Sequence, residues 1–198
     1  MQGLPLYANI EEVRRDALDC EACRRSETRS QVVFGAGPPD AKLMVIGEAP
    51  SGTDDRTGLP FTGPAGGVLD LVLERAGTAR DEVWITNLVR CYAGRVRDGR
   101  EENRPVRNDE IRACSVWLDL EIQYVDPLVI LAVGAPATKV LISPQIKVSE
   151  QRGQAHTRPD GRTVIPTVQP AYLMRMRAHV DEDEYTQALD ALVADITA

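Results

Sequence analysis

Lys42-Leu-Met-Val-Ile-Gly47 is a short apolar run that ends in glycine, the pattern of a strand buried inside a sheet. After a polar loop the chain continues as Pro64-Ala-Gly-Gly-Val-Leu-Asp-Leu-Val-Leu-Glu-Arg-Ala-Gly77, with proline near the start and glycine at the end, as is typical of a helix. The same order returns at Leu128-Val-Ile-Leu-Ala-Val133, where Gly134 opens the next helix. Strands that alternate with helices predict a parallel sheet covered by helices on both faces.

Further segments fit this pattern. A chain of 198 residues has the length of one domain. We expect residues 1–198 to form it, with an N-terminal helix followed by an arm that carries a cysteine pair. The other expected strands are 83–86 and 163–168, and the other expected helices are 10–18, one that starts at a cap on Asn108, and 181–196.

Composition limits the class of protein. Hydrophobic residues make up 43% of the chain, which excludes wholesale disorder. No apolar run approaches the roughly 18 residues of a membrane span, and the N-terminus lacks the order of a signal peptide, so we expect a soluble, cytoplasmic protein. The net charge of −7 argues against coating nucleic acid by bulk electrostatics, although salt screening leaves room for a local basic groove. All but three of the 23 basic residues are arginines, which suit phosphate, but a habitat bias explains this equally well.

The ligand site is expected at one edge of the sheet. In parallel sheets, ligands bind beyond the carboxyl ends of the strands. Three loops leave those ends, at residues 47–63, 86–107 and 168–175. The function should therefore lie where these loops converge.

The four cysteines predict a metal site. Cys20 and Cys23 form a CxxC pair, and Cys91 and Cys114 lie far downstream. Four thiolates suit zinc or an iron–sulfur cluster, and their spacing does not choose between the two. The alternatives are a redox-active CxxC pair and a buried core cysteine at Cys114. A redox pair should follow a strand and open a helix, whereas this one follows the first helix, so the spacing favours a metal site.

The loop after the first strand contains the candidate chemistry. Glu48, Asp54 and Asp55 lie there with one aromatic residue, Phe61, in a segment stiffened by glycine and proline. Such a loop could orient a water molecule while the ring stacks on a flat ligand, or it could be an ordinary solvated acidic turn. Asn87 ends the neighbouring strand, and its carboxamide offers a donor and an acceptor that match the edge of a nucleobase. This combination favours a base-binding pocket.

The chain resembles the iron–sulfur uracil-DNA glycosylases of family 4 from Cys20 to about Arg177. The resemblance rests on a set of sequence motifs, on their order along the chain, and on the four cysteines. The motifs are Phe34-Gly-Ala-Gly37, Leu43-Met-Val-Ile-Gly-Glu-Ala-Pro50, Gly58-Leu-Pro-Phe-Thr-Gly-Pro-Ala-Gly66, Ile85-Thr-Asn-Leu-Val-Arg-Cys91, Glu110-Ile-Arg-Ala-Cys114, Pro127-Leu-Val-Ile-Leu-Ala-Val-Gly134 and Pro166-Thr-Val-Gln-Pro-Ala-Tyr-Leu-Met-Arg175.

The resemblance implies a fold and an activity. The fold is a three-layer α/β/α domain around a four-stranded, mainly parallel sheet. The activity is hydrolysis of the N-glycosidic bond of uracil in DNA, after the base has been flipped out of the stack. Phe61 would stack on the base, Asn87 would read its edge, and the backbone at Glu48 and Ala49 with an acidic side chain, Glu48 or Asp54, would orient the water. The four cysteines would hold a structural [4Fe–4S] cluster: Cys20, Cys23, Cys91 and Cys114.

Three departures from the family pattern qualify these expectations. Ser51 replaces a glycine after the Gly-Glu-Ala-Pro run. The segment between Cys91 and Cys114 is longer than usual and rich in arginine. It resembles in position the insertion of a relative that bonds covalently to the abasic sugar through a histidine, but it holds no histidine, so the sequence does not support that chemistry here. The family's His-Pro motif is here Gln169-Pro170, so the usual donor to the leaving base is an amide. We therefore expect Gln169 to act as a neutral hydrogen-bond donor and the enzyme to be slow.

Three functions remain open at this stage. The first is an active uracil-DNA glycosylase that acts as a monomer on uracil-containing DNA. The second is a module that binds uracil-containing or damaged DNA, or another partner, with little excision. The third is an iron–sulfur electron-transfer protein, which the base-pocket motifs disfavour. We expect His156 and His179 to be solvated or structural residues. Residues expected to contact DNA are Arg95, Arg97, Arg175 and Arg177, although the last two could equally be a charged helix surface.

Overall fold

The computed structural model describes residues 6–97, 100–177 and 179–197, and of residues 95–97 and 100–103 it describes only the backbone. Its main sheet has five strands. Neighbouring strands run parallel except at the β6 edge, where the two-residue β6 pairs antiparallel with β7. In spatial order the strands are β2 (Trp84–Asn87), β1 (Leu43–Gly47), β5 (Val129–Val133), β7 (Thr163–Thr167) and β6 (His156–Thr157).

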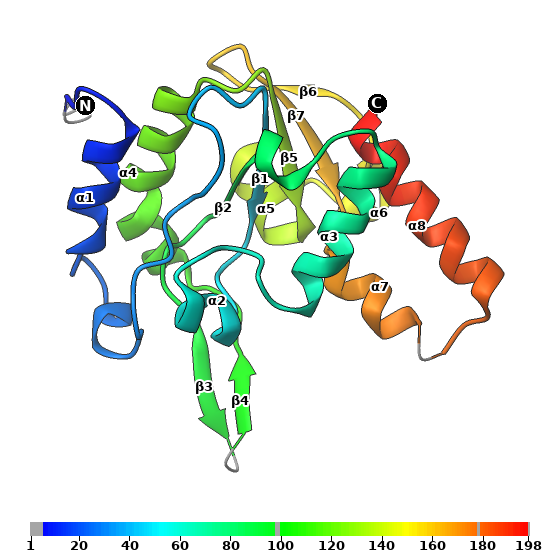
Figure 1. The fold of residues 1–198 in the computed structure, drawn as a ribbon, viewed down its shortest axis with the longest axis horizontal. Helices are drawn as coiled ribbons and strands as arrows, with labels where there is room; N and C mark the ends of the chain where they lie inside the picture. Colours follow the sequence, from blue (N-terminus) through cyan, green and yellow to red (C-terminus); the bar gives the residue numbers. More distant parts are fainter. Residues whose placement is uncertain (1–5, 98–99, 178, 198) are drawn as a thin grey trace.

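Helices cover both faces of this sheet. Successive side chains along a strand point to opposite faces, and here both sets are apolar. Met44 and Ile46 of β1 pack on one face, and Val45 between them packs on the other. The first face is covered by α1 (Ile10–Leu18), α4 (Asn108–Val125) and α5 (Gly134–Leu141), and the second by α3 (Pro64–Arg75) and α8 (Glu182–Thr197) (Figure 1). The predicted three-layer α/β/α architecture is confirmed.

The elements after β1 and β2 differ from the sequence prediction. The polar loop after β1 contains α2 (Gly52–Thr57), and the arginine-rich loop contains a hairpin of β3 (Gly94–Arg97) and β4 (Arg100–Asn103). In Figure 1 this hairpin extends away from the sheet, next to α2. The sheet also has the edge strand β6 in addition to the four predicted strands.

The start of α4 corrects one expectation. Asn108 does not cap this helix but is its first residue, and Arg107 occupies the cap position. Glu110 provides the capping hydrogen bond: its carboxylate accepts from the backbone N–H of Arg107 at 3.0 Å.

The carboxyl ends of the four parallel strands meet at one edge. Gly47 and Asn87 are paired in register at the ends of β1 and β2, as are Val133 and Thr167 at the ends of β5 and β7. The segment after β7 turns into α7 (Pro170–Met176), which packs beside α3 and α8. The remaining short helices are η1 (Arg24–Glu27), η2 (Arg80–Glu82) and α6 (Val148–Gln151).

None of the helices in the described ranges is both long and apolar enough to cross a membrane.

Candidate active site

A cavity of about 670 Å³ lies at the carboxyl edge of the sheet, a size within the range of small-molecule sites. The loops after β1, β2, β5 and β7 all contribute to its wall, as the sequence predicted for a parallel sheet. Its lining includes seven of the predicted site residues: Glu48, Ala49, Asp54, Phe61, Asn87, Gln169 and Arg175.

Hydrogen bonds within the loop after β1 fix its shape. Asp54 is buried, and its carboxylate accepts from the backbone N–H of Ser51 at 2.8 Å, from the N–H of Thr62 at 2.6 Å and from the Thr62 hydroxyl at 2.8 Å. The Ser51 hydroxyl accepts from the N–H of Asp54 in return, which completes a capping box for α2. Ser51 thus stabilises the start of this helix.

Phe61 is held against the cavity in an unusual backbone conformation. Its φ of +54° lies in the left-handed region, which non-glycine residues seldom adopt. Gly66 in the first turn of α3 makes this possible, because a Cβ there would lie 1.7 Å from the carbonyl oxygen of Phe61. The helix backbone therefore packs directly on the Phe61 peptide and sets the direction of the ring.

Asn87 provides an unpaired polar group at the cavity wall. The residue is 2% exposed, and its Nδ2 has no hydrogen-bond partner among the described residues. A buried donor without a partner costs about 1–3 kcal/mol, so a ligand acceptor at this place would be stabilised. A Cβ on Gly47 would lie 2.5 Å from Asn87 Oδ1 and 2.6 Å from the Phe61 ring. The glycine thus allows the amide oxygen and the ring to pack directly against the backbone at the end of β1.

Gln169 lines the cavity opposite the end of β5. It occupies the N-cap position of α7, but its side chain makes no capping hydrogen bond. Gly134 has a φ of +84°, and a Cβ there would lie 2.5 Å from Gln169 Cγ. A glycine is required here both by the backbone conformation and by the space that the glutamine occupies.

Glu48 is tied to the segment that follows the hairpin. Its Oε1 accepts a hydrogen bond from the backbone N–H of Val106 at 3.0 Å. Arg104 and Pro105, which precede Val106, line the cavity. The half-buried Glu48 carboxylate is therefore held between the loop after β1 and a segment almost 60 residues downstream.

The arginines predicted to contact DNA occupy different places. Arg175 is exposed and lines the cavity. Arg177 lies outside the cavity wall, with its guanidinium 5.1 Å from the centre of the Tyr185 ring. Arg95 and Arg97 belong to β3, but their side chains fall outside the described part of the structure.

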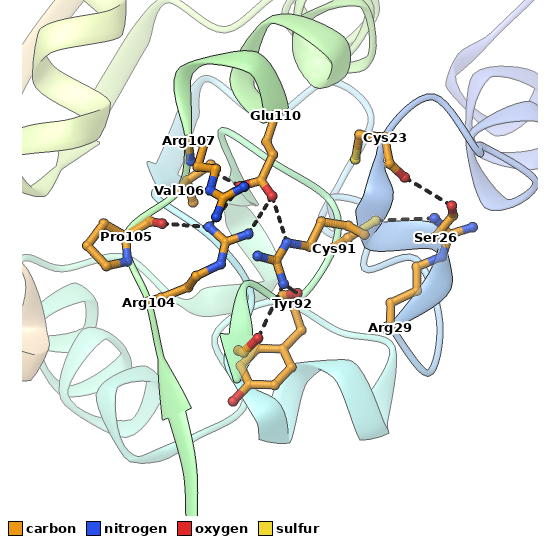
Figure 2. A network of polar contacts seen from close by, with 12 residues as sticks. Cys23, Ser26, Arg29, Cys91, Tyr92, Arg104, Pro105, Val106, Arg107 and Glu110 are labelled. Atoms are coloured by element: carbon orange, nitrogen blue, oxygen red, sulfur yellow. Dashed lines mark hydrogen bonds and ion pairs between the residues drawn. The ribbon is translucent and has the colours of Figure 1, made fainter. Parts of the chain in front are cut away.

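The four cysteines converge beside this site. All four are free thiols; Cys91 and Cys114 are buried, and Cys20 and Cys23 are half-buried. Arg29 Nη1 donates a hydrogen bond to Cys91 Sγ at 3.4 Å (Figure 2), and the backbone N–H of Arg90 donates to Cys114 Sγ at 3.3 Å. Hydrogen bonds from these N–H groups would stabilise the negative charge of a thiolate at either sulfur atom.

The pKa shifts of the thiols report their mutual proximity. Burial raises the pKa of Cys91 to about 12; Arg29 opposes the rise, and Cys114 and Cys23 add to it. Burial also raises the pKa of Cys114, with a further contribution from Cys20 and Cys23. No group of three or more His, Cys, Asp or Glu side chains within the described ranges is arranged to hold a single metal ion. The mutual pKa effects nevertheless indicate that the four thiols lie near one another.

Comparison with known proteins places the chain in a family. Residues 34–193 match the family profile described as the uracil DNA glycosylase superfamily. The chain belongs to this superfamily. It is 33% identical to a type-4 uracil-DNA glycosylase of Sulfurisphaera tokodaii, over 88% of this chain and 81% of the relative. It is also 33% identical to a type-4 uracil-DNA glycosylase of Thermotoga maritima, over 86% of this chain and 85% of the relative. The resemblance seen in the motifs is confirmed.

Several residues of this superfamily member's site were not predicted from its sequence. The further lining residues are Arg56, Tyr92, Arg104, Pro105 and Met174. Of these, only Met174 belongs to one of the quoted motifs, Pro166–Arg175. A partial signal was available for Arg104, because the arginine-rich segment was already assigned to the edge of the sheet that binds ligands.

Proposed function

We propose that this protein removes uracil from DNA by hydrolysing the N-glycosidic bond, in the compartment that holds the genome. One observation carries the proposal. The buried amide of Asn87 lacks a partner for its Nδ2, and its Oδ1 and the ring of Phe61 both pack against Gly47 in the cavity wall. A planar base with a polar edge fits this arrangement, and membership of the superfamily supports uracil as that base.

Binding of the base follows from the chemistry of these two side chains. The target nucleotide must leave the DNA stack to reach the cavity, which costs a few kcal/mol. Stacking on Phe61 offsets part of this cost, because base–aromatic stacking contributes about 1–3 kcal/mol per base. The Nδ2 of Asn87 donates to a carbonyl oxygen of uracil, and its Oδ1 accepts from the ring N–H.

Cleavage needs a positioned water molecule and a donor to the leaving base. We assign the water to Glu48, whose carboxylate lines the cavity, together with the backbone at Ala49. We assign the donor to Gln169, whose side chain is not used for capping. Negative charge develops on the uracil oxygen as the bond breaks, and a hydrogen bond to that oxygen stabilises the transition state.

Asp54 was a second candidate for the acidic group. Its carboxylate accepts three hydrogen bonds from its own loop. This favours a positioning role, in which Asp54 holds the loop that orients Glu48 and Phe61.

We further propose that the four cysteines hold a [4Fe–4S] cluster. Four free thiols, of which Cys91 and Cys114 have their pKa raised in part by the other cysteines, with N–H donors at two of the sulfur atoms, fit such a group. When bound, the cluster supplies a covalent cross-link between the arm after α1, the loop after β2 and α4. Its ligands would be Cys20, Cys23, Cys91 and Cys114.

DNA binding is assigned to arginines around the cavity. Arg175 is exposed at the cavity wall, and Arg104 and Arg56 also line it. Local cations at this edge attract phosphates although the whole chain carries a net charge of −7. Arg95, Arg97 and Arg177 remain predicted DNA contacts, and a single polypeptide of residues 1–198 acting as a monomer remains the expected unit.

A second function is favoured by one observation, the presence of glutamine at position 169. A neutral donor stabilises the leaving base less than a charged one, so a protein that binds uracil-containing DNA with little excision is the alternative.

A gel assay separates the two functions. The wild-type protein is mixed with an oligonucleotide that contains one uracil, and with a matched one that contains thymine. Strand breakage after alkali treatment of the uracil oligonucleotide alone supports excision. A mobility shift without breakage would instead establish the binding function.

A further inference from the structure

The segment from Arg104 to Arg107 connects the hairpin to α4 and forms part of the cavity wall. Two carboxylates hold its consecutive backbone N–H groups. The N–H of Val106 donates to Glu48 at 3.0 Å, and the N–H of Arg107 donates to Glu110 at 3.0 Å. The position of Glu48 in the cavity is therefore linked to that of Glu110 through a single residue, Val106, whose two flanking planar peptide groups each carry one of these N–H donors.

Glu110 is the centre of a buried ion-pair network (Figure 2). It is 5% exposed, and its Oε1 accepts from Arg25 Nε at 2.9 Å. Arg104 donates to both of its carboxylate oxygens. Burial acts to raise the pKa of Glu110, but the hydrogen bonds from Arg104 and Arg107 and the charges of both arginines outweigh it and lower the pKa. The carboxylate is therefore charged and fully engaged.

The network also holds the other end of the hairpin. Arg25 Nη1 donates to the carbonyl oxygen of Gly94 at 3.3 Å and to that of Tyr92 at 3.5 Å. The backbone N–H of Arg104 donates to the carbonyl oxygen of Ala93 at 2.9 Å. Both strands of the hairpin are thus anchored at the point where they leave the cavity wall.

We infer that Glu110 is a positioning residue for Glu48: by holding Arg104 and the N–H of Arg107, it keeps the N–H of Val106 on the Glu48 carboxylate. This inference rests on the proposed function, because it assigns Glu48 to the water that attacks the sugar. Glu110 itself does not line the cavity, so it acts only through the segment that it holds.

An ion pair that only stabilises the fold would affect stability but not the excision rate of the folded protein. A buried pair elsewhere in the chain provides the comparison. Asp195 of α8 is 4% exposed and accepts hydrogen bonds from Arg152 and from the hydroxyl of Thr167, away from the cavity lining. Asp195→Asn should lower stability without changing the excision rate of the folded protein, and it serves as the matched control.

The test is a double-mutant cycle. Single-turnover excision is measured for wild type, Glu48→Ala, Glu110→Gln and the double variant, with the iron content of each checked first. Glu110→Gln should slow excision about 10-fold in the wild-type background and less than 2-fold in the Glu48→Ala background, because residues that act through each other are not additive. An equal slowing in both backgrounds would overturn the inference.

A second readout does not depend on activity. In DNA-free protein, hydrogen exchange of a peptide that covers residues 104–107 should become at least 5-fold faster in Glu110→Gln and in Glu48→Ala, and should not change in Asp195→Asn. Unchanged exchange in Glu110→Gln would contradict the inference even if the protein excises uracil. If the wild type excises no uracil, the proposed function fails, and the exchange experiment still decides whether Glu110 holds the segment.

Glu110→Gln leaves the buried Arg25 and the half-buried Arg104 without their carboxylate and can prevent folding. The double variant Arg25→Gln/Glu110→Gln keeps the net charge of the network. The same exchange and excision results are expected for it, and normal exchange with normal excision would refute the inference.

Discussion

Replacing Gln169 with histidine tests the leaving-group step of the proposed reaction. Gln169 faces the cavity, does not cap α7, and lies against Gly134, where no side chain crowds it. Its amide can donate one hydrogen bond to a uracil oxygen. It cannot carry the positive charge that an imidazolium could place beside the developing anion.

The size of the effect follows from the strength of these hydrogen bonds. One donor to a developing oxyanion contributes about 3–4 kcal/mol. A charge-assisted hydrogen bond is roughly twice as strong as a neutral one, so the glutamine lacks about 1.5–2 kcal/mol of this stabilisation. Since about 1.4 kcal/mol corresponds to a tenfold change in rate, Gln169→His should excise uracil about 10–30-fold faster than the wild type.

The assay is single-turnover excision with enzyme in excess, followed by alkali cleavage of the oligonucleotide. Affinity for a uracil-free oligonucleotide is measured in parallel and should change less than about 2-fold, because the substitution acts on charge that appears only in the transition state. Gln187→His, on the exposed surface of α8, is the matched control and should have the wild-type rate. An unchanged or lower rate for Gln169→His would show that position 169 does not donate to the leaving base.

Three further predictions address the pocket, the thiols and acid stability. Asn87→Asp should slow single-turnover excision about 10–150-fold, because a hydrogen bond worth about 1.5–3 kcal/mol is lost; an unchanged rate would place the base elsewhere. Wild-type protein purified without oxygen should hold about four iron atoms, and Cys114→Ala should lose iron and soluble yield together; stoichiometric zinc in a colourless wild type would contradict this. Burial acts to raise the pKa of Asp160, but the backbone N–H of Arg162 and the charges of Arg158 and Arg162 lower it below its ordinary value of 3.8. Asp160→Asn should therefore lower Tm at pH 7, and the difference from wild type should vanish as pH falls through the folded-state pKa; a difference that stays constant down to pH 2 would refute this.

The central sheet was predictable because its strands are buried on both faces. Met44, Val45 and Ile46 all pack in the interior, so the strand reads as a continuous apolar run. The edge strand β6 has two residues, His156 and Thr157, and so leaves no pattern of this kind. Similarly, α2 depends on the capping box rather than on an apolar face, and the polar sequence of 52–57 resembles that of a loop.

The candidate site was predictable where a side chain follows directly from a strand end. Asn87 ends β2, and Gln169 follows β7 by two residues, so the parallel sheet alone brings them to one edge. The network around Glu110 is different. Arg25 and Glu110 are 85 residues apart, and both look like surface charges in the sequence. Only the folded chain shows that they are buried against each other, because pairing of charges over that separation leaves no local signal.

Direct detection of free uracil tests the central claim. Wild-type protein in excess over an oligonucleotide with one uracil should release one equivalent of the free base, and a thymine oligonucleotide should release none. Retention of uracil in the oligonucleotide, with the DNA bound and the iron content intact, would contradict the assignment of this cavity to base excision.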